Sequence, residues 1–328
     1  MIDANENDTL LEVRRLKKFF STKRGPLHAV DDVNFAIKKG KTLGVVGESG
    51  CGKTTLGRVV LGLIQATDGE IIFDGRDITY AKGKQWKELR KEMQIIFQDP
   101  MSSLNPRFTV FDAISESFAI FGEHRNKAAL NENVYSLMNT VGLDERLSAS
   151  HPHELDGGRR QRIGIARALA LNPKFIVCDE PVSALDVSIQ AQILNLLQDL
   201  QVQHNLTYIF ITHDLSVVKH ISDEIIVMYL GCVVEKCGAK ELFRNQLHPY
   251  TKGLIAAIPI PDITIKIKPV ILKGELSSPV NPKPGCRFAA RCNFTKDKCY
   301  TENPPLIEEM PNHFVACHYC RDINKLYE

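Results

Sequence analysis

Short apolar runs alternate with stretches of helical spacing along most of the chain. The runs predict strands over residues 42–46, 70–73, 94–97, 174–178, 206–212 and 225–230. The spacing after the first run predicts a helix over residues 54–64. Because apolar strands that alternate with helices are typical of a mostly parallel sheet with helices on both faces, the pattern predicts an α/β fold.

Residues 101–171 interrupt this alternation. They contain few strand signals, and their apolar spacing predicts helices over residues 110–121, 131–141 and 158–170. We therefore expect a helical insert within the α/β fold.

Length and charge limit the possible organisation. The chain has 328 residues, which at about 150 residues per domain predicts roughly two domains. Pro259 and Pro261 indicate a boundary between a body, residues 1–259, and a C-terminal extension, residues 260–328. A formal net charge of +2 argues against a strongly basic nucleic-acid-binding protein. No apolar run reaches the roughly 18 residues of a transmembrane helix, and the acidic N-terminus lacks the apolar region of a signal peptide.

The segment from Gly47 to Thr54, Gly-Glu-Ser-Gly-Cys-Gly-Lys-Thr, matches the phosphate-binding P-loop pattern and follows a predicted strand. Its glycines let backbone N–H groups turn toward phosphate oxygens, and the N-terminus of the next helix adds a favourable dipole. Lys53 is placed to reach the β- and γ-phosphates, and the Thr54 hydroxyl is placed to bind Mg²⁺. Cys51 is interpreted as a plain small residue, with redox sensing as the alternative.

Two carboxylates follow the predicted strand over 174–178. Asp179 would lie at the carboxyl end of a sheet strand, where ligands bind in open α/β folds. It suits a water-mediated Mg²⁺ ligand, whereas Glu180 points elsewhere and suits orienting or polarising an attacking water.

These segments resemble motifs of the ATP-binding-cassette ATPases, and the resemblance extends over residues 10–259. Four further segments resemble the family's Q-loop, signature motif, D-loop and switch-histidine loop, in the family's order: Phe97–Pro100, Glu154–Arg162, Ser183–Asp186 and Thr212–Asp214. Phe20 lies about where the family has its adenine-stacking aromatic residue, and Phe19 is the competitor. The resemblance implies a P-loop NTPase core of the RecA type with an antiparallel β region, a helical subdomain insert and a small C-terminal extension. The core would comprise residues 1–100 and 172–259, and the helical subdomain residues 101–171.

The resemblance also implies roles for individual residues. His213 would contact the γ-phosphate and Gln98 the Mg²⁺ ion or the attacking water, so Lys53, Gln98, Glu180 and His213 are the expected catalytic residues. The residues expected to bind ATP are Phe20, Gly47, Glu48, Ser49, Gly50, Cys51, Gly52, Lys53, Thr54, Thr55, Gln98 and Asp179. Those expected to hold Mg²⁺ are Thr54, Gln98 and Asp179.

In this family two cassettes pair head to tail, and each ATP lies between one P-loop and the partner's signature motif. The expected signature residues are Leu155, Asp156, Gly157, Gly158 and Arg159, and the D-loop residues are Ser183, Ala184, Leu185 and Asp186. Family members usually carry Ser at the position of Asp156 and Gln at that of Arg159. An ionised Asp156 would repel the γ-phosphate, or would instead cap the helix that starts at Gly157 and point away. We expect the composite site that uses this motif to be weakened or asymmetric.

Five of the nine cysteines lie in the last 43 residues. The first spacings among them do not fit the short knuckles of structural zinc sites, and disulfides are disfavoured in a chain without a signal peptide. Four thiolates can ligate a [4Fe–4S] cluster, although the spacing is not that of a ferredoxin. The segment resembles the C-terminal extension of oligopeptide/dipeptide importers, some of which hold such a cluster. The resemblance implies Cys286, Cys292, Cys299 and Cys317 as ligands with Cys320 as a spare; zinc and free or structural cysteines are the alternatives.

The motifs together predict the ATPase subunit of an importer, hydrolysing ATP to ADP and phosphate to power uptake of dipeptides or oligopeptides. The expected partners are a second cassette, identical or different, two membrane permease subunits and, indirectly, a substrate-binding protein, at the cytoplasmic face of the cell membrane. Nucleic acid is not an expected partner. The alternatives are an importer of nickel or another small solute, and a soluble cassette ATPase of DNA repair or translation. A non-hydrolysing scaffold is disfavoured because Lys53, Asp179, Glu180 and His213 are all present.

Overall fold

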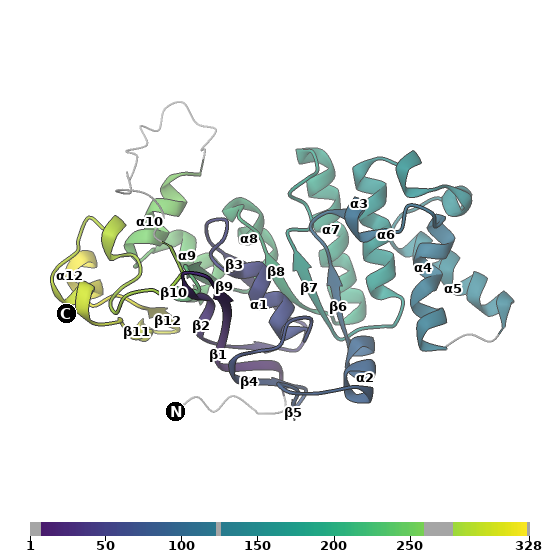
Figure 1. Ribbon diagram of the computed structural model, residues 1–328. Coiled ribbons are helices and arrows are strands. Elements are labelled where there is room, and N and C mark those ends of the chain that lie inside the picture. The colour runs from purple at the N-terminus through teal and green to yellow at the C-terminus, as the bar shows by residue number, and fades with distance from the viewer. Residues whose placement is uncertain (1–7, 123–125, 259–277, 327–328) are drawn as a thin grey trace, which may run out of the picture. The chain divides into compact units, whose positions relative to one another are not determined.

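The computed structural model describes residues 8–122, 126–258 and 278–326 (Figure 1). The chain forms two compact units. The first comprises Met1–Tyr80 and Phe210–Glu328, and the second comprises Ala81–Ile209. The predicted boundary at residues 259 and 260 lies outside the described residues, so the predicted domain limits stay a prediction.

The first unit begins with an antiparallel sheet of four strands in the order β2-β1-β4-β5. A long hairpin joins β1 and β2, and its register runs from Thr9 opposite Lys38 to Thr22 opposite Gly25. The side chains of Leu11, Val13 and Leu16 on β1 are buried. The strand bounds are β1 Thr9–Thr22, β2 Gly25–Lys38, β4 Asp68–Phe73 and β5 Arg76–Asp77.

A second sheet of the first unit carries the predicted P-loop, residues 47–54. Strand β3 pairs in parallel with β9, and β9 continues antiparallel through β10 and β12 to β11. The strand bounds are β3 Thr42–Val46, β9 Glu224–Tyr229, β10 Cys232–Gly238, β11 Ile307–Met310 and β12 His313–Val315. The helices of this unit are α1 Lys53–Val60, α8 Leu215–Ile221, α9 Ala239–Arg244, α10 Pro249–Ala256, η4 Ala289–Arg291, α11 Lys298–Thr301 and α12 Cys320–Asn324.

The second unit combines parallel strands with helices. Strand β6 pairs in parallel with β7, and both strands run into the motifs named above. The elements of this unit are α2 Lys84–Glu92, β6 Met93–Ile96, α3 Pro100–Ser103, α4 Val110–Phe121, α5 Lys127–Thr140, η2 Glu145–Ala149, η3 Pro152–Glu154, α6 Gly157–Leu169, β7 Phe175–Asp179 and α7 Val187–His204. The boundary between the units falls within β8, Thr207–Ile211.

The structure confirms the α/β fold class and each predicted strand, with end points that agree to within two residues. Two predicted helix bounds were wrong. Helix α1 ends at Val60 instead of residue 64, because Gly62 adopts a positive φ of 61° and stops the helix. Helix α5 begins four residues before the predicted start, where the Asn126 side chain accepts a hydrogen bond from the Ala128 amide. Most strand pairs of the first unit are antiparallel. This unit therefore contains the antiparallel β region that the family resemblance implies.

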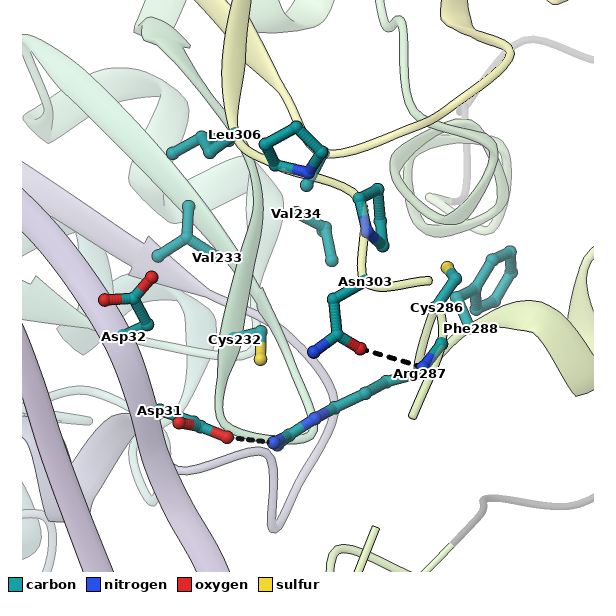
Figure 2. Close-up of a pocket in the computed structure, with 14 residues that line it drawn as sticks. Asp31, Asp32, Cys232, Val233, Val234, Cys286, Arg287, Phe288, Asn303 and Leu306 are labelled. Atoms are coloured by element: carbon teal, nitrogen blue, oxygen red, sulfur yellow. Dashed lines mark hydrogen bonds and ion pairs between the residues drawn. The ribbon is translucent and has the colours of Figure 1, made fainter. Parts of the chain in front are cut away.

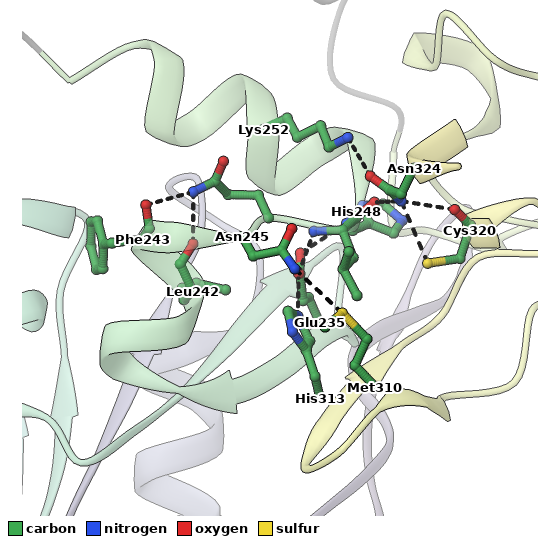
Figure 3. Close-up of polar contacts among 12 residues, drawn as sticks. Glu235, Leu242, Phe243, Asn245, His248, Lys252, Met310, His313, Cys320 and Asn324 are labelled. Atoms are coloured by element: carbon green, nitrogen blue, oxygen red, sulfur yellow. Dashed lines mark hydrogen bonds and ion pairs between the residues drawn. The ribbon is translucent and has the colours of Figure 1, made fainter. Parts of the chain in front are cut away.

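A buried carboxylate on β10 contacts the C-terminal segment, residues 278–326 (Figure 3). Glu235 on β10 is fully buried and accepts hydrogen bonds from the amides of Leu247 and His248, at 2.8 and 3.0 Å. The third partner is His313 on β12, whose Nε2 lies 2.7 Å from the Glu235 carboxylate. Because unpaired buried charge is costly, the chain must bring these three groups to Glu235 when it folds.

Candidate functional site

The predicted P-loop has the geometry that phosphate binding requires. It connects the fully buried strand β3 to helix α1, and Gly47, Gly50 and Gly52 all have positive φ values, 152°, 78° and 108°. A Cβ atom at Gly52 would lie 2.0 Å from the Ala29 carbonyl oxygen, whereas one at Gly50 would meet nothing within 4 Å. Residue 52 must therefore be glycine for steric reasons, while the surface at residue 50 is open.

Lys53 lies folded within this loop. Its side chain is 4% exposed, and its Nζ donates hydrogen bonds to the carbonyl oxygens of Gly47 and Glu48, at 2.8 and 3.1 Å. A buried ammonium group at the N-terminus of an eight-residue helix makes a local positive potential that suits an anion. The Lys53 ammonium group and the backbone amides at the start of α1 are hydrogen-bond donors of the kind that suits a nucleotide phosphate.

Cys51 is a small buried packing residue. It is 1% exposed, and its burial raises the pKa of the thiol above its ordinary value. The thiolate is the reactive form of cysteine, so this environment favours the interpretation as a plain residue over redox sensing.

The second unit brings three predicted residues together at the ends of β6 and β7. Asp179, 2% exposed, is the last residue of β7 and offers a buried carboxylate of the kind that suits Mg²⁺. Glu180 follows with a positive φ of 48°, a conformation that costs free energy for a non-glycine residue. Gln98 donates from its Nε2 to the Glu180 carboxylate at 3.0 Å. The Gln98 amide and Glu180 thus form one polar pair.

The signature segment forms the start of helix α6. Asp156 is the N-cap residue, and its Oδ1 accepts a hydrogen bond from the Arg159 amide at 2.8 Å. Its Oδ2 lies 3.4 Å from the Arg159 guanidinium Nε. The structure therefore confirms that Asp156 caps the helix that starts at Gly157.

The D-loop packs against the signature segment within the second unit. A Cβ atom at Gly157 would lie 3.1 Å from the Leu185 side chain, and one at Gly158 would lie 2.7 Å from Ile189. Asp186 caps helix α7 by accepting from the Ile189 amide at 3.0 Å. The Ser183 hydroxyl donates to the Glu180 carbonyl oxygen at 3.1 Å, which ties this loop to the end of β7.

The other predicted nucleotide residues lie in the first unit. His213 is exposed immediately after β8, in front of helix α8, whose N-cap is Asp214. Phe20 is partly exposed on β1, with the Lys18 ammonium 4.9 Å from its ring centre. Phe19 instead stacks on His28, with ring centres 3.9 Å apart, so one of its faces is covered. The structure thus leaves Phe20 as the more accessible of the two aromatic residues.

Four of the C-terminal cysteines line one small cavity. Cys286, Cys292, Cys299 and Cys317 share it with His318 and neighbouring apolar residues, and its volume is about 20 Å³. Cys320 is buried elsewhere, 3.6 Å from the Asn324 side chain, and does not line this cavity.

Backbone amides face three of these four sulfurs. The Phe294 amide donates to the Cys292 Sγ at 3.4 Å. The amides of Phe288 and Tyr319 oppose the dominant effect of burial, which raises the pKa of Cys286 to about 12 and that of Cys317 to about 11. Amide hydrogen bonds to sulfur are a means by which proteins stabilise metal-bound thiolates. The donor types therefore fit a thiolate-bound metal group, but among the described residues no three side chains are arranged to hold a metal ion.

Sequence reasoning missed two residues that contact the P-loop. The Tyr250 hydroxyl accepts a hydrogen bond from the Glu48 amide at 2.9 Å. Arg291 forms a two-point ion pair with the Glu48 carboxylate, although the two residues are 243 positions apart in the sequence. No local pattern signals such a pair, since it depends on how distant segments meet.

Comparison with known proteins identifies the family to which this chain belongs. A family model described as "ABC transporter" matches residues 30–183, and one described as "Oligopeptide/dipeptide transporter, C-terminal region" matches residues 234–299. The oligopeptide transport ATP-binding protein AppF of Bacillus subtilis is 50% identical, covering 97% of this chain and 99% of the relative. The chain belongs to the ATP-binding subunits of ABC transporters. It is accordingly an ATPase of the P-loop class.

Other relatives and solved structures agree with this membership of the ABC ATPases. The oligopeptide transport ATP-binding protein OppF of Haemophilus influenzae is 48% identical, covering 97% of this ATPase and 99% of the relative. Among solved structures, cbiO1 of Clostridium perfringens has a TM-score of 0.65 at 30% identity, covering 73% of this chain and 92% of that one. The ATP-binding cassette MJ0796 bound to ADP and phosphate has a TM-score of 0.64 at 26% identity, covering 70% and 99%. Within the described part of the ATPase, none of the helices has the length and apolar character to cross a membrane.

Proposed function

We propose that this ATPase powers the import of oligopeptides or dipeptides through separate membrane permease subunits. The observation that carries the proposal is the near-full-length identity of 48–50% with proteins named as oligopeptide transport ATP-binding proteins. The match of residues 234–299 to the C-terminal region of oligopeptide/dipeptide transporters supports the same assignment.

The phosphate-binding step is assigned to the P-loop. The buried ammonium of Lys53 exchanges its carbonyl partners for the β- and γ-phosphates of ATP, and the loop amides donate to the phosphate oxygens. Thr54, Gln98 and Asp179 would provide oxygen ligands for Mg²⁺, which would neutralise phosphate charge when bound. Phe20 stacks on the adenine with its exposed face.

The hydrolysis step is assigned to three polar side chains, those of Glu180, Gln98 and His213. Glu180 accepts a proton from the attacking water, and Gln98, which already donates to Glu180 at 3.0 Å, holds that carboxylate in place. His213 donates to the γ-phosphate. The signature segment of a partner cassette contributes the amides at the start of its helix α6, so hydrolysis requires a dimer.

The partners follow from this mechanism. A second cassette pairs head to tail with this one, two permease subunits receive the motion, and a substrate-binding protein delivers the peptide outside. The ATPase then works at the cytoplasmic face of the cell membrane. The cassette does not itself bind the transported solute, so an importer of nickel or another small solute is the second candidate.

Reconstitution of the transporter in proteoliposomes tests the proposal. We expect ATP hydrolysis to rise with a peptide-loaded binding protein and to be lost in Lys53→Ala, because the phosphate then has no ammonium partner. Glu88→Gln, a change on the surface of helix α2, is the matched control and should keep the wild-type rate. Stimulation by Ni²⁺ and not by peptides would assign the second candidate instead.

We further propose that Cys286, Cys292, Cys299 and Cys317 ligate a [4Fe–4S] cluster, with zinc as the alternative metal. The support is the shared cavity and the amide hydrogen bonds to sulfur described above. Such a cluster would be an electron-rich thiolate-bound group with a structural role in the C-terminal segment. Anaerobic purification followed by iron and sulfide assay decides the point. Colourless protein with stoichiometric zinc would refute the cluster, and Cys320→Ser, outside the cavity, should retain the wild-type metal content.

A further inference from the structure

The C-terminal segment contacts the P-loop through a partly buried ion pair between Arg291 and Glu48. Arg291 is 9% exposed and ends the short turn η4. Its two terminal nitrogens donate to the two carboxylate oxygens of Glu48, at 2.8 and 3.1 Å. The guanidinium carbon also lies 5.9 Å from the centre of the Tyr229 ring. A two-point pair of this kind fixes orientation as well as charge.

Every polar group of Glu48 is engaged in this structure. Its amide donates to the Tyr250 hydroxyl at 2.9 Å, and its carboxylate pairs with Arg291. Its carbonyl oxygen accepts from the Lys53 Nζ at 3.1 Å and from the Cys51 amide at 3.3 Å. Residues outside the loop therefore determine the conformation of its second position, and with it the direction of the neighbouring amides.

The charge of Glu48 is unfavourable at this place unless it is paired. A carboxylate within a loop that binds a polyanion raises the electrostatic free energy of the bound state. The Arg291 guanidinium neutralises that carboxylate, and it also holds the carboxylate against the C-terminal segment on one side of the loop.

We propose that Arg291 is a positioning residue for nucleotide binding, which holds the P-loop in its phosphate-binding conformation and neutralises Glu48. Arg291 acts through Glu48 and is not itself required to touch ATP. The inference rests on the proposed assignment of residues 47–54 as the phosphate-binding loop.

A second arginine of the same segment offers a matched control. Arg287 pairs with the Asp31 carboxylate (Figure 2). It also donates a hydrogen bond to the Leu230 carbonyl oxygen. It thus fastens the segment that carries Cys286 and Cys292 to β2 and to the turn after β9, without contacting Glu48. We expect a variant at Arg287 to weaken the docking of the segment and to leave the Glu48 pair intact.

The experiment compares Arg291→Gln with Arg287→Gln in the full chain. The measurements are KM and kcat for MgATP in the reconstituted transporter, and binding of a fluorescent ATP analogue to the purified subunit. We expect Arg291→Gln to raise KM and the dissociation constant about tenfold with little change in kcat, as breaking one strong pair interaction does. Arg287→Gln should stay near wild type in both constants. The double variant Arg291→Gln/Glu48→Gln should recover most of the affinity, because it removes the unpaired charge.

Two results would overturn the positioning role. One is a wild-type KM in Arg291→Gln, and the other is an equal rise of KM in Arg287→Gln, which would make docking of the segment the cause. Where Arg291→Gln does not fold, Arg291→Lys replaces it, since it keeps the charge and loses the two-point geometry. Its KM should then be intermediate, and an unchanged KM again overturns the role. Lys53→Ala separates the two proposals: normal ATP binding in that variant refutes the proposed phosphate site itself.

Discussion

Replacing Asp156 tests whether its charge weakens the composite ATP site. Asp156→Ser and Asp156→Asn both keep a side-chain oxygen that can cap helix α6, so the helix should be retained. Two unit charges about 5 Å apart repel by about 1 kcal/mol in bulk water and by about 3 kcal/mol at an effective dielectric constant near 20. Because the Asp156 side chain is 60% exposed and Arg159 lies beside it, the lower figure applies. We expect the KM for ATP to fall about fivefold in both variants.

The assay is steady-state ATP hydrolysis by the reconstituted transporter as a function of MgATP concentration. Thermal melting of each variant serves as the control, and an unchanged melting temperature shows that the cap is retained. An unchanged KM in both variants would refute the charge argument. A fall in Asp156→Ser alone would assign the effect to the hydroxyl donor and not to the lost charge.

Three further predictions concern hydrolysis, the loop and pH. Glu180→Gln should slow ATP hydrolysis at least about 100-fold while ATP binding persists, measured by parallel rate and binding assays; equal loss of binding would contradict this. Gly52→Ala should weaken ATP binding far more than Gly50→Ala, because only the first Cβ meets the Ala29 carbonyl, at 2.0 Å; equal effects would refute the steric reason. Burial lowers the pKa of His248 to about 4 in the folded protein, whereas a histidine in the unfolded chain has an ordinary pKa of about 6.5. Between these two pH values the unfolded chain therefore binds more protons than the folded protein. The free energy of unfolding should fall by up to about 3 kcal/mol as the pH drops through that window. The measurement is the urea-unfolding midpoint as a function of pH. In His248→Asn, which keeps the cap on α10, this midpoint should depend less on pH.

Local chemistry made much of the site predictable. The P-loop, the Asp179-Glu180 pair and the signature segment each lie on contiguous residues, and each occurs at a strand end or helix start that apolar periodicity already indicates. Even the capping role of Asp156 follows from its position one residue before the helix. The long hairpin of β1 and β2 was not predicted, although residues 33–38 of β2 alternate between buried and exposed positions. Strand β1 has no such regular alternation, and many of its residues are exposed or partly exposed.

Contacts between distant segments were decided only by the tertiary structure. Glu235 is an ordinary polar residue in the sequence, yet in the fold it is fully buried against His313. The strained φ of Glu180 likewise appears only when the chain is folded.

The sequence by itself determined the class of protein, the nucleotide motifs and the cysteine set, since each depends on residue types at short, regular spacing. Only the tertiary structure decided what surrounds the P-loop. Arg291 and Glu48 meet across 243 positions because the C-terminal segment adds strands to the same sheet from which the loop emerges. Pairing at such separation depends on the path of the whole backbone, which no local pattern of side chains encodes.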